Sequence, residues 1–185
     1  LAGTGIETAT GVLVDEYLQT SARDVYAAGD CAELRTPAPA RRAVEPLWYT
    51  ARAMGETVAR NVCGYPAPYH QGIWHNAARF FDTEYQIYGQ VPATTPPGVR
   101  SLYWEHASRK KSVRVNYDLA TGAVTGFQTM GIRYRQQVCE HWIDTGTHIS
   151  DVLNNLSKAN FDPEFYRRHE SEIVSLFQQY LSEKS

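Results

Sequence analysis

The chain has 185 residues, of which 43% are hydrophobic and 21% are charged, and its net charge is -2. This composition is typical of a globular protein and argues against disorder. Because 18 basic residues nearly balance 20 acidic ones, we expect no nucleic-acid partner. No apolar run reaches the length of a membrane span, so we expect no membrane partner either.

The three cysteines, Cys31, Cys63 and Cys139, lie far apart and form no Cys-x-x-Cys pair. Neither a zinc ribbon nor a local redox disulfide is therefore predicted, and we assign no metal site and no catalytic residue. Free thiols favour a cytoplasmic location. The 12 tyrosines and 4 tryptophans fit a ligand site or a subunit interface, and they fit a tyrosine-rich sheet equally well.

The chain opens at Leu1 without a methionine, and we expect it to be a portion of a longer protein. Two short apolar runs, Gly11–Asp15 and Asp24–Asp30, predict strands of a buried sheet. The proline-rich stretch 34–45 predicts a loop.

Residues 46–63 are predicted to form a helix, because Pro46 suits a first turn and Gly64 suits the left-handed position after the last turn. The expected apolar face follows helical spacing and consists of Leu47, Ala51, Met54, Val58 and Val62.

From Trp74 to Gly131 the periodicity becomes that of strands, which predicts an antiparallel meander. The expected strands are Glu84–Tyr88, Val99–His106, Val113–Tyr117 and Val124–Met130.

Three helices are expected after the meander, over Ile132–Asp144, over Ser150–Leu156 and from Asp162 onward. In the last helix Asp162 suits the N-cap, Pro163 the first turn, and Glu164 pairs with Arg168. Its expected apolar face consists of Phe165, Ile173, Leu176 and Tyr180, with His169 among them.

The segment Val25–Asp30 holds the most informative motif, a buried run that ends in Gly29-Asp30. A glycine allows a ligand to approach the backbone closely, and an aspartate accepts hydrogen bonds from sugar-like hydroxyls. From the residues alone, a ligand site and a simple loop cap both remain open.

With Gly11–Asp15 and Thr20-Ser21 at the expected spacing before it, this segment resembles the second FAD-binding signature of the FAD-dependent pyridine nucleotide-disulfide oxidoreductases. The resemblance implies that Asp30 contacts a ribityl hydroxyl of FAD and that Gly29 lets the chain approach it.

The same resemblance implies that the helix opening at Pro46, Leu47 and Trp48 points at the flavin pyrimidine end. Backbone N–H groups of Leu47 and Trp48 would then stabilise negative charge there. Glu45 departs from this picture, because an acidic residue opposes that charge unless it caps the helix.

The stretches Trp74–Asn76, Phe80–Asp82 and Glu84–Gly89 look closest to the ferredoxin/rubredoxin-reductase-like branch of this family. The implied fold class is α+β: an antiparallel β-meander packed with helices, preceded by the terminal strand segment and helix of an FAD-binding domain. The expected domains are the FAD-domain remnant (1–64), the sheet domain (65–131) and a helical extension (132–185).

The resemblance implies an enzyme, an FAD oxidoreductase that uses NAD(P)H, forms a homodimer and passes electrons to an acceptor such as a small redox carrier protein. No Gly-x-Gly-x-x-Gly occurs, so this portion alone is expected to be inactive and to bind FAD weakly or not at all. The alternatives are a dimerisation or interaction module without flavin, and an unrelated α+β protein.

Four further candidates have a plainer interpretation beside the functional one. Cys139-Glu140-His141 fits a packed cysteine better than a metal site, because its side chains point to different helix faces. His70 and His75 fit a loop or a ligand contact. The basic turn 109–111 is either solvated or a dock for an acidic electron carrier. His169-Glu170 fits a surface or core histidine better than a catalytic dyad.

Overall fold

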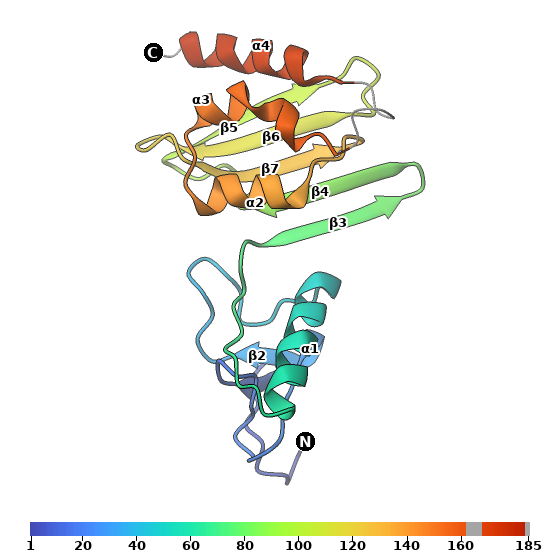
Figure 1. The fold of residues 1–185 in the computed structure, drawn as a ribbon, viewed down its shortest axis with the longest axis vertical. Helices are drawn as coiled ribbons and strands as arrows, with labels where there is room; N and C mark the ends of the chain where they lie inside the picture. Colours follow the sequence, from blue (N-terminus) through green and yellow to red (C-terminus); the bar gives the residue numbers. More distant parts are fainter. Residues whose placement is uncertain (162–167, 184–185) are drawn as a thin grey trace. The chain divides into compact units, whose positions relative to one another are not determined.

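The computed structural model of the chain describes residues 1–161 and 168–183, which group into two compact units, Leu1–Gly72 and Ile73–Ser185 (Figure 1). The division into residues 1–64, 65–131 and 132–185 stays a prediction. The features expected at Asp162, Pro163, Glu164 and Phe165 lie outside the described residues.

The first unit contains a small parallel sheet of β1 (Val12–Val14) and β2 (Ala32–Leu34), and a short 3-10 helix, η1 (Gly29–Cys31), leads directly into β2. The expected strand over Gly11–Asp15 is thus confirmed. The expected strand over Asp24–Asp30 is wrong. Its backbone instead bonds to the preceding turn, where the Thr20 N–H donates to the Val25 carbonyl and the Ala27 N–H to the Leu18 carbonyl.

The helix α1 (Trp48–Val62) packs on this sheet and confirms the expected helix. Met54 is buried in the core of the first unit, and Val58 packs against it from one turn further on. Val62 is 63% exposed, so its place on the apolar face is wrong, since the core ends one turn earlier. Gly64 has φ +81°, which agrees with the left-handed position expected after the helix.

The second unit is built on a five-stranded sheet whose neighbouring strands are all antiparallel, in the order β3-β4-β7-β6-β5. The strands are β3 (His75–Phe80), β4 (Thr83–Gly89), β5 (Val99–Glu105), β6 (Ser112–Asp118) and β7 (Val124–Met130). The antiparallel sheet confirms the expected fold class, and strands β5, β6 and β7 follow one another as a meander.

Strand β4 pairs with β7 rather than with β5, which a simple meander would not do. The chain therefore crosses from β4 to β5 through residues 90–98, and this crossing needs a close backbone approach. A Cβ at Gly126 would lie 2.4 Å from the Gln90 carbonyl oxygen, so glycine is the residue that leaves room for the crossing.

The helices of the second unit pack on one face of the sheet (Figure 1). They are α2 (Gln136–Asp144), α3 (Ile149–Asn154), the 3-10 helix η2 (Leu156–Ala159) and α4 (Glu170–Ser182). The helix expected from Ile132 begins only at Gln136. The backbone of Tyr134 is engaged elsewhere, because its N–H donates to the Gln86 side chain and it forms an antiparallel β-bridge with Asn160. In α4 the buried residues include Ile173 and Phe177, whereas Tyr180 lies exposed, contrary to expectation.

The opposite face of the sheet carries none of the described helices of this unit. Strand alternation places Phe80, Tyr103 and Met130 on that face, and all three are exposed. Across the described residues, no helix combines the length and the apolar character that crossing a bilayer requires.

The core of the second unit predicts a sharp contrast between two phenylalanines. Phe127 is fully buried between the sheet and α2, so Phe127→Ala should lower the free energy of unfolding by about 3–5 kcal/mol. Phe81 is 99% exposed, and Phe81→Ala should change that free energy by less than about 0.5 kcal/mol. Urea denaturation of both variants measures this, and equal effects would contradict the packing.

Candidate functional site

Gly29 and Asp30 lie directly against the first turns of α1. Gly29 has φ +78°, and a Cβ placed on it would lie 3.5 Å from the Ala51 Cβ. The Gly29 N–H points at the Met54 Sδ, at 3.3 Å. Asp30 is exposed, and its carboxylate makes no hydrogen bond to any residue in the described part of the chain. A free acceptor therefore stands beside the start of the helix.

The N-terminus of α1 is left without a side-chain cap. Leu47 is the N-cap residue, and its carbonyl accepts the first helical hydrogen bond, from the Ala51 N–H. The amides of the first turn, beginning with Trp48, have no helical acceptor and carry the positive end of the helix dipole. Of the two expected donors, Leu47 is already engaged, since its N–H donates to the Glu45 carbonyl at 2.8 Å.

The residues around this terminus are open to solvent on one side. Pro46 is exposed and, as a proline, has no N–H to offer. The indole of Trp48 is also exposed, packs edge-on against Tyr49, and lies under the Arg52 guanidinium. The structure thus packs η1, which carries Gly29 and Asp30, against α1, whose first residue is the exposed Trp48. These two elements, η1 and the first turn of α1, are called the wall below.

Glu45 does not cap the helix, so the capping interpretation is wrong. Its carboxylate is buried and makes two hydrogen bonds with the Arg41 guanidinium, at 2.7 and 2.5 Å. Burial and the Glu45 carboxylate raise the pKa of the neighbouring Tyr69, and Arg41 acts in the opposite direction. Sequence reasoning missed this pair, although the four-residue spacing of Arg41 and Glu45 was a signal.

The wall offers hydrogen-bond acceptors at one end and donors at the other. Asp30 can accept bonds from hydroxyl groups, and the N-terminus of α1 can donate bonds to an electron-rich group. Gly11 helps to set the position of η1, since a Cβ there would lie 2.6 Å from the Cys31 carbonyl oxygen. This arrangement suits an elongated ligand that is hydroxylated at one end and accepts hydrogen bonds at the other.

The remaining candidates have structural roles in the second unit. Cys139 is fully buried. Burial raises the pKa of its thiol, and the charge of Glu140 adds a smaller increase, so Cys139 behaves as a packed cysteine. His75 lies 3.3 Å from Glu140. His169 is a core histidine, and its Nε2 lies 3.0 Å from the Lys111 Nζ, which ties one residue of the basic turn to α4.

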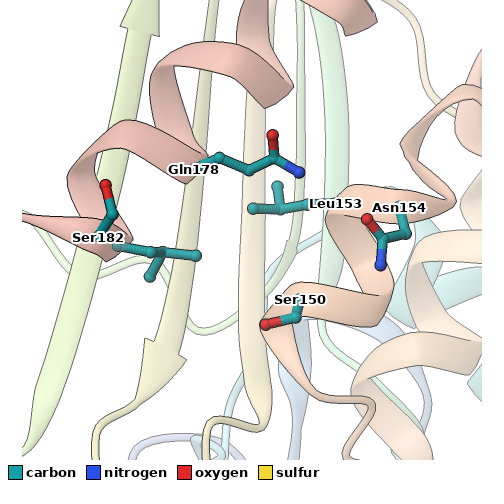
Figure 2. A pocket seen from close by; sticks show the side chains of 6 residues that line it. Ser150, Leu153, Asn154, Gln178 and Ser182 are labelled. Carbon is teal, nitrogen blue, oxygen red and sulfur yellow. The ribbon is translucent and has the colours of Figure 1, made fainter. Parts of the chain in front are cut away.

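Two features elsewhere in the described part of the chain bear on binding. No group of three or more His, Cys, Asp or Glu side chains there is placed to hold a metal ion. A groove between α3 and α4 has no charged side chain in its lining (Figure 2). Its lining residues are Ser150, Leu153, Asn154, Gln178, Leu181 and Ser182.

Known proteins resemble this chain in sequence. Residues 1–55 match the family model described as pyridine nucleotide-disulphide oxidoreductase. NADH-rubredoxin oxidoreductase from Clostridium acetobutylicum is 35% identical over 154 residues, which cover 83% of this chain and 39% of that protein. Rubredoxin-NAD(+) reductase from Alcanivorax borkumensis is 44% identical over 55 residues, which are 30% of this chain and 14% of that protein. The chain spans less than half the length of these curated relatives.

Solved structures confirm the fold. An NAD-dependent persulfide reductase from A. fulgidus superposes with a TM-score of 0.65 at 18% identity, over 94% of this chain and 34% of that one. An FAD-dependent pyridine nucleotide-disulphide oxidoreductase from Desulfovibrio vulgaris gives a TM-score of 0.64 at 18% identity, over 96% of this chain and 44% of that one. Taken with the family match and the curated relatives, these findings show that the chain belongs to the pyridine nucleotide-disulphide oxidoreductase family.

Proposed function

We propose that this chain is the C-terminal part of an NAD(P)H-dependent FAD oxidoreductase and forms the ribityl and pyrimidine edge of its flavin site. The observation that carries the proposal is the exposed Asp30 carboxylate beside the uncapped N-terminus of α1. Family membership of residues 1–55, which include both elements, supports the same assignment.

The chemistry of the wall fits FAD. The ribityl chain carries hydroxyl groups, which would donate hydrogen bonds to the Asp30 carboxylate. Gly29 has no side chain that would keep the ligand away from the backbone. The pyrimidine ring carries hydrogen-bond acceptors, which suit the Trp48 N–H. Pro46, Leu47 and Trp48 would shape this end, with Leu47 contributing its carbonyl to the helix rather than an N–H to the cofactor.

In such an enzyme, bound FAD supplies the redox chemistry by accepting a hydride from NAD(P)H. The residues of this chain orient the cofactor, and the positive end of α1 stabilises negative charge on it. The remaining part of the FAD site and the nicotinamide site would be supplied by the rest of the protein. Relatives named as rubredoxin reductases support a small redox carrier protein as the electron acceptor. The free thiols of Cys31, Cys63 and Cys139 favour the cytoplasm as the location of this chain.

Removing the Asp30 carboxylate should weaken FAD binding in the full-length protein. A hydrogen bond to a charged group contributes about 1.5–3 kcal/mol, so Asp30→Ala should raise the dissociation constant of FAD roughly ten- to hundredfold. Flavin fluorescence titration of the apoprotein measures this. Asp144→Ala removes an exposed carboxylate at the end of α2 and serves as the control, with an unchanged constant. If the two variants bind FAD equally well, Asp30 is not a flavin ligand.

The 185-residue chain by itself should bind FAD weakly or not at all, because it holds only one edge of the proposed site. Flavin fluorescence should therefore stay unquenched at chain concentrations that saturate the full-length protein. Tight binding by the chain alone would contradict this division of the site. A full-length protein that takes up no FAD and reduces no dye with NAD(P)H would overturn the proposed function itself.

We also propose that the second unit is a packing and dimerisation domain. The same unit would carry the function if this chain acted only as a non-catalytic interaction module. The supporting observation is the sheet face that no described helix of the unit covers, with Phe80, Tyr103 and Met130 exposed on it. Apolar and aromatic side chains are enriched at the centres of protein interfaces.

This second proposal predicts that the isolated chain dimerises at high concentration. Tyr103→Asp would place a charge on the uncovered face and should weaken the dimer. Tyr180→Asp is the matched control, because Tyr180 is 41% exposed on α4 whereas Tyr103 is 42% exposed on the sheet. Sedimentation velocity separates the outcomes, and a monomer at every concentration would count against dimerisation.

A further inference from the structure

We propose that Arg41 is a positioning residue for the flavin edge: it neutralises Glu45 beside the N-terminus of α1 and fixes the loop from which that helix begins. This inference rests on the proposed flavin site. It adds a residue that makes no direct contact with the cofactor and acts on it through the charge and the position of its neighbours.

The geometry of the pair is that of a clamp. The Arg41 Nε donates to one Glu45 carboxylate oxygen at 2.7 Å, and Nη2 donates to the other at 2.5 Å. Such a two-point contact holds both side chains in one orientation, which a lysine could not do. Glu45 in turn accepts the Leu47 N–H at its carbonyl, so the clamp connects directly to the N-cap of α1.

The third guanidinium nitrogen extends the clamp to the end of the first unit. Arg41 Nη1 donates to the carbonyl oxygens of Gln71 and Gly72, at 2.9 and 2.5 Å. The Gln71 side chain returns the contact, since its Oε1 accepts the Ala38 N–H and its Nε2 donates to the Arg42 carbonyl. The proline-rich loop before α1 is therefore held on two sides, although it has no regular secondary structure.

Burial makes the charge balance of this pair consequential. The side chains of Arg41 and Glu45 are only 10% and 4% exposed, so water does little to screen either charge. Glu45 lies two residues before the N-cap. An unpaired carboxylate there would offset the positive end of the helix dipole and disfavour negative charge on a ligand at that terminus. Paired with Arg41, the carboxylate has no such effect.

An exposed pair of the same type lies further along α1 and supplies the control. Arg52 and Glu56 form an ion pair at the same four-residue spacing, with Nε and Oε1 2.9 Å apart, but their side chains are 64% and 66% exposed. Solvent screens these charges, so Glu56→Gln removes a carboxylate from the same helix with little expected effect on the flavin edge.

The test measures charge at the flavin in the full-length protein loaded with FAD. Sulfite binding to a flavin adds negative charge to its ring system, so the sulfite dissociation constant reports electrostatics at the pyrimidine edge without turnover. Arg41→Gln leaves Glu45 unpaired and should raise this constant roughly three- to tenfold, with a more negative flavin midpoint potential. Glu45→Gln leaves Arg41 unpaired and should lower the constant by a similar factor, with a less negative potential.

The double variant Arg41→Gln/Glu45→Gln should return both quantities to near the values of the unchanged protein, and Glu56→Gln should not move them. Opposite signs in the two single variants identify neutralisation, because mere loosening of the loop would shift both in the same direction. If Arg41→Gln does not fold, Glu45→Gln and the double variant decide alone. Shifts of the same sign, or no shift in a protein that holds FAD, would overturn the role of Arg41 while leaving the flavin site intact.

Discussion

The close packing of η1 against the first turns of α1 is the constraint on which the candidate site depends. It brings Ala51 into van der Waals range of Gly29, whose φ of +78° is one that glycine adopts without strain, and it sets the Met54 Sδ 3.3 Å from the Gly29 N–H. Since η1 leads straight into β2, this packing also fixes the helix on the sheet. The result is an exposed carboxylate, that of Asp30, on the element that packs against the first turns of α1, although the two elements are far apart in the sequence.

In the second unit, the main constraint is the burial of one sheet face by helices. Its helices bury one face of an antiparallel sheet and form a single core, which accounts for its compactness. The other face retains exposed aromatic and sulfur-containing side chains. The exposed Phe80, Tyr103 and Met130 on this face are the observation behind the proposed role of the unit in association.

Local sequence signals predicted the regular elements well and the irregular ones poorly. Helix α1 and strands β4 to β7 follow from periodicity, because each has one face that must be buried whatever its surroundings. The stretch Asp24–Asp30 has the apolar content of a strand, yet its backbone bonds to a neighbouring turn. The start of α2 was also misplaced, since the Gln86 side chain, which is distant in the sequence, captures the Tyr134 amide.

The sequence by itself determined the family and the α+β class, and it singled out Gly29 and Asp30 as candidate ligand residues, because a glycine followed by an aspartate after an apolar run is a local pattern. Only the tertiary structure decided that Leu47 is unavailable as a donor, that Glu45 pairs with Arg41 instead of capping α1, and that β4 lies beside β7. These features depend on which of several possible partners forms a hydrogen bond or an ion pair once distant segments of the chain are packed together. Such competition is settled by packing, and no local pattern encodes its outcome.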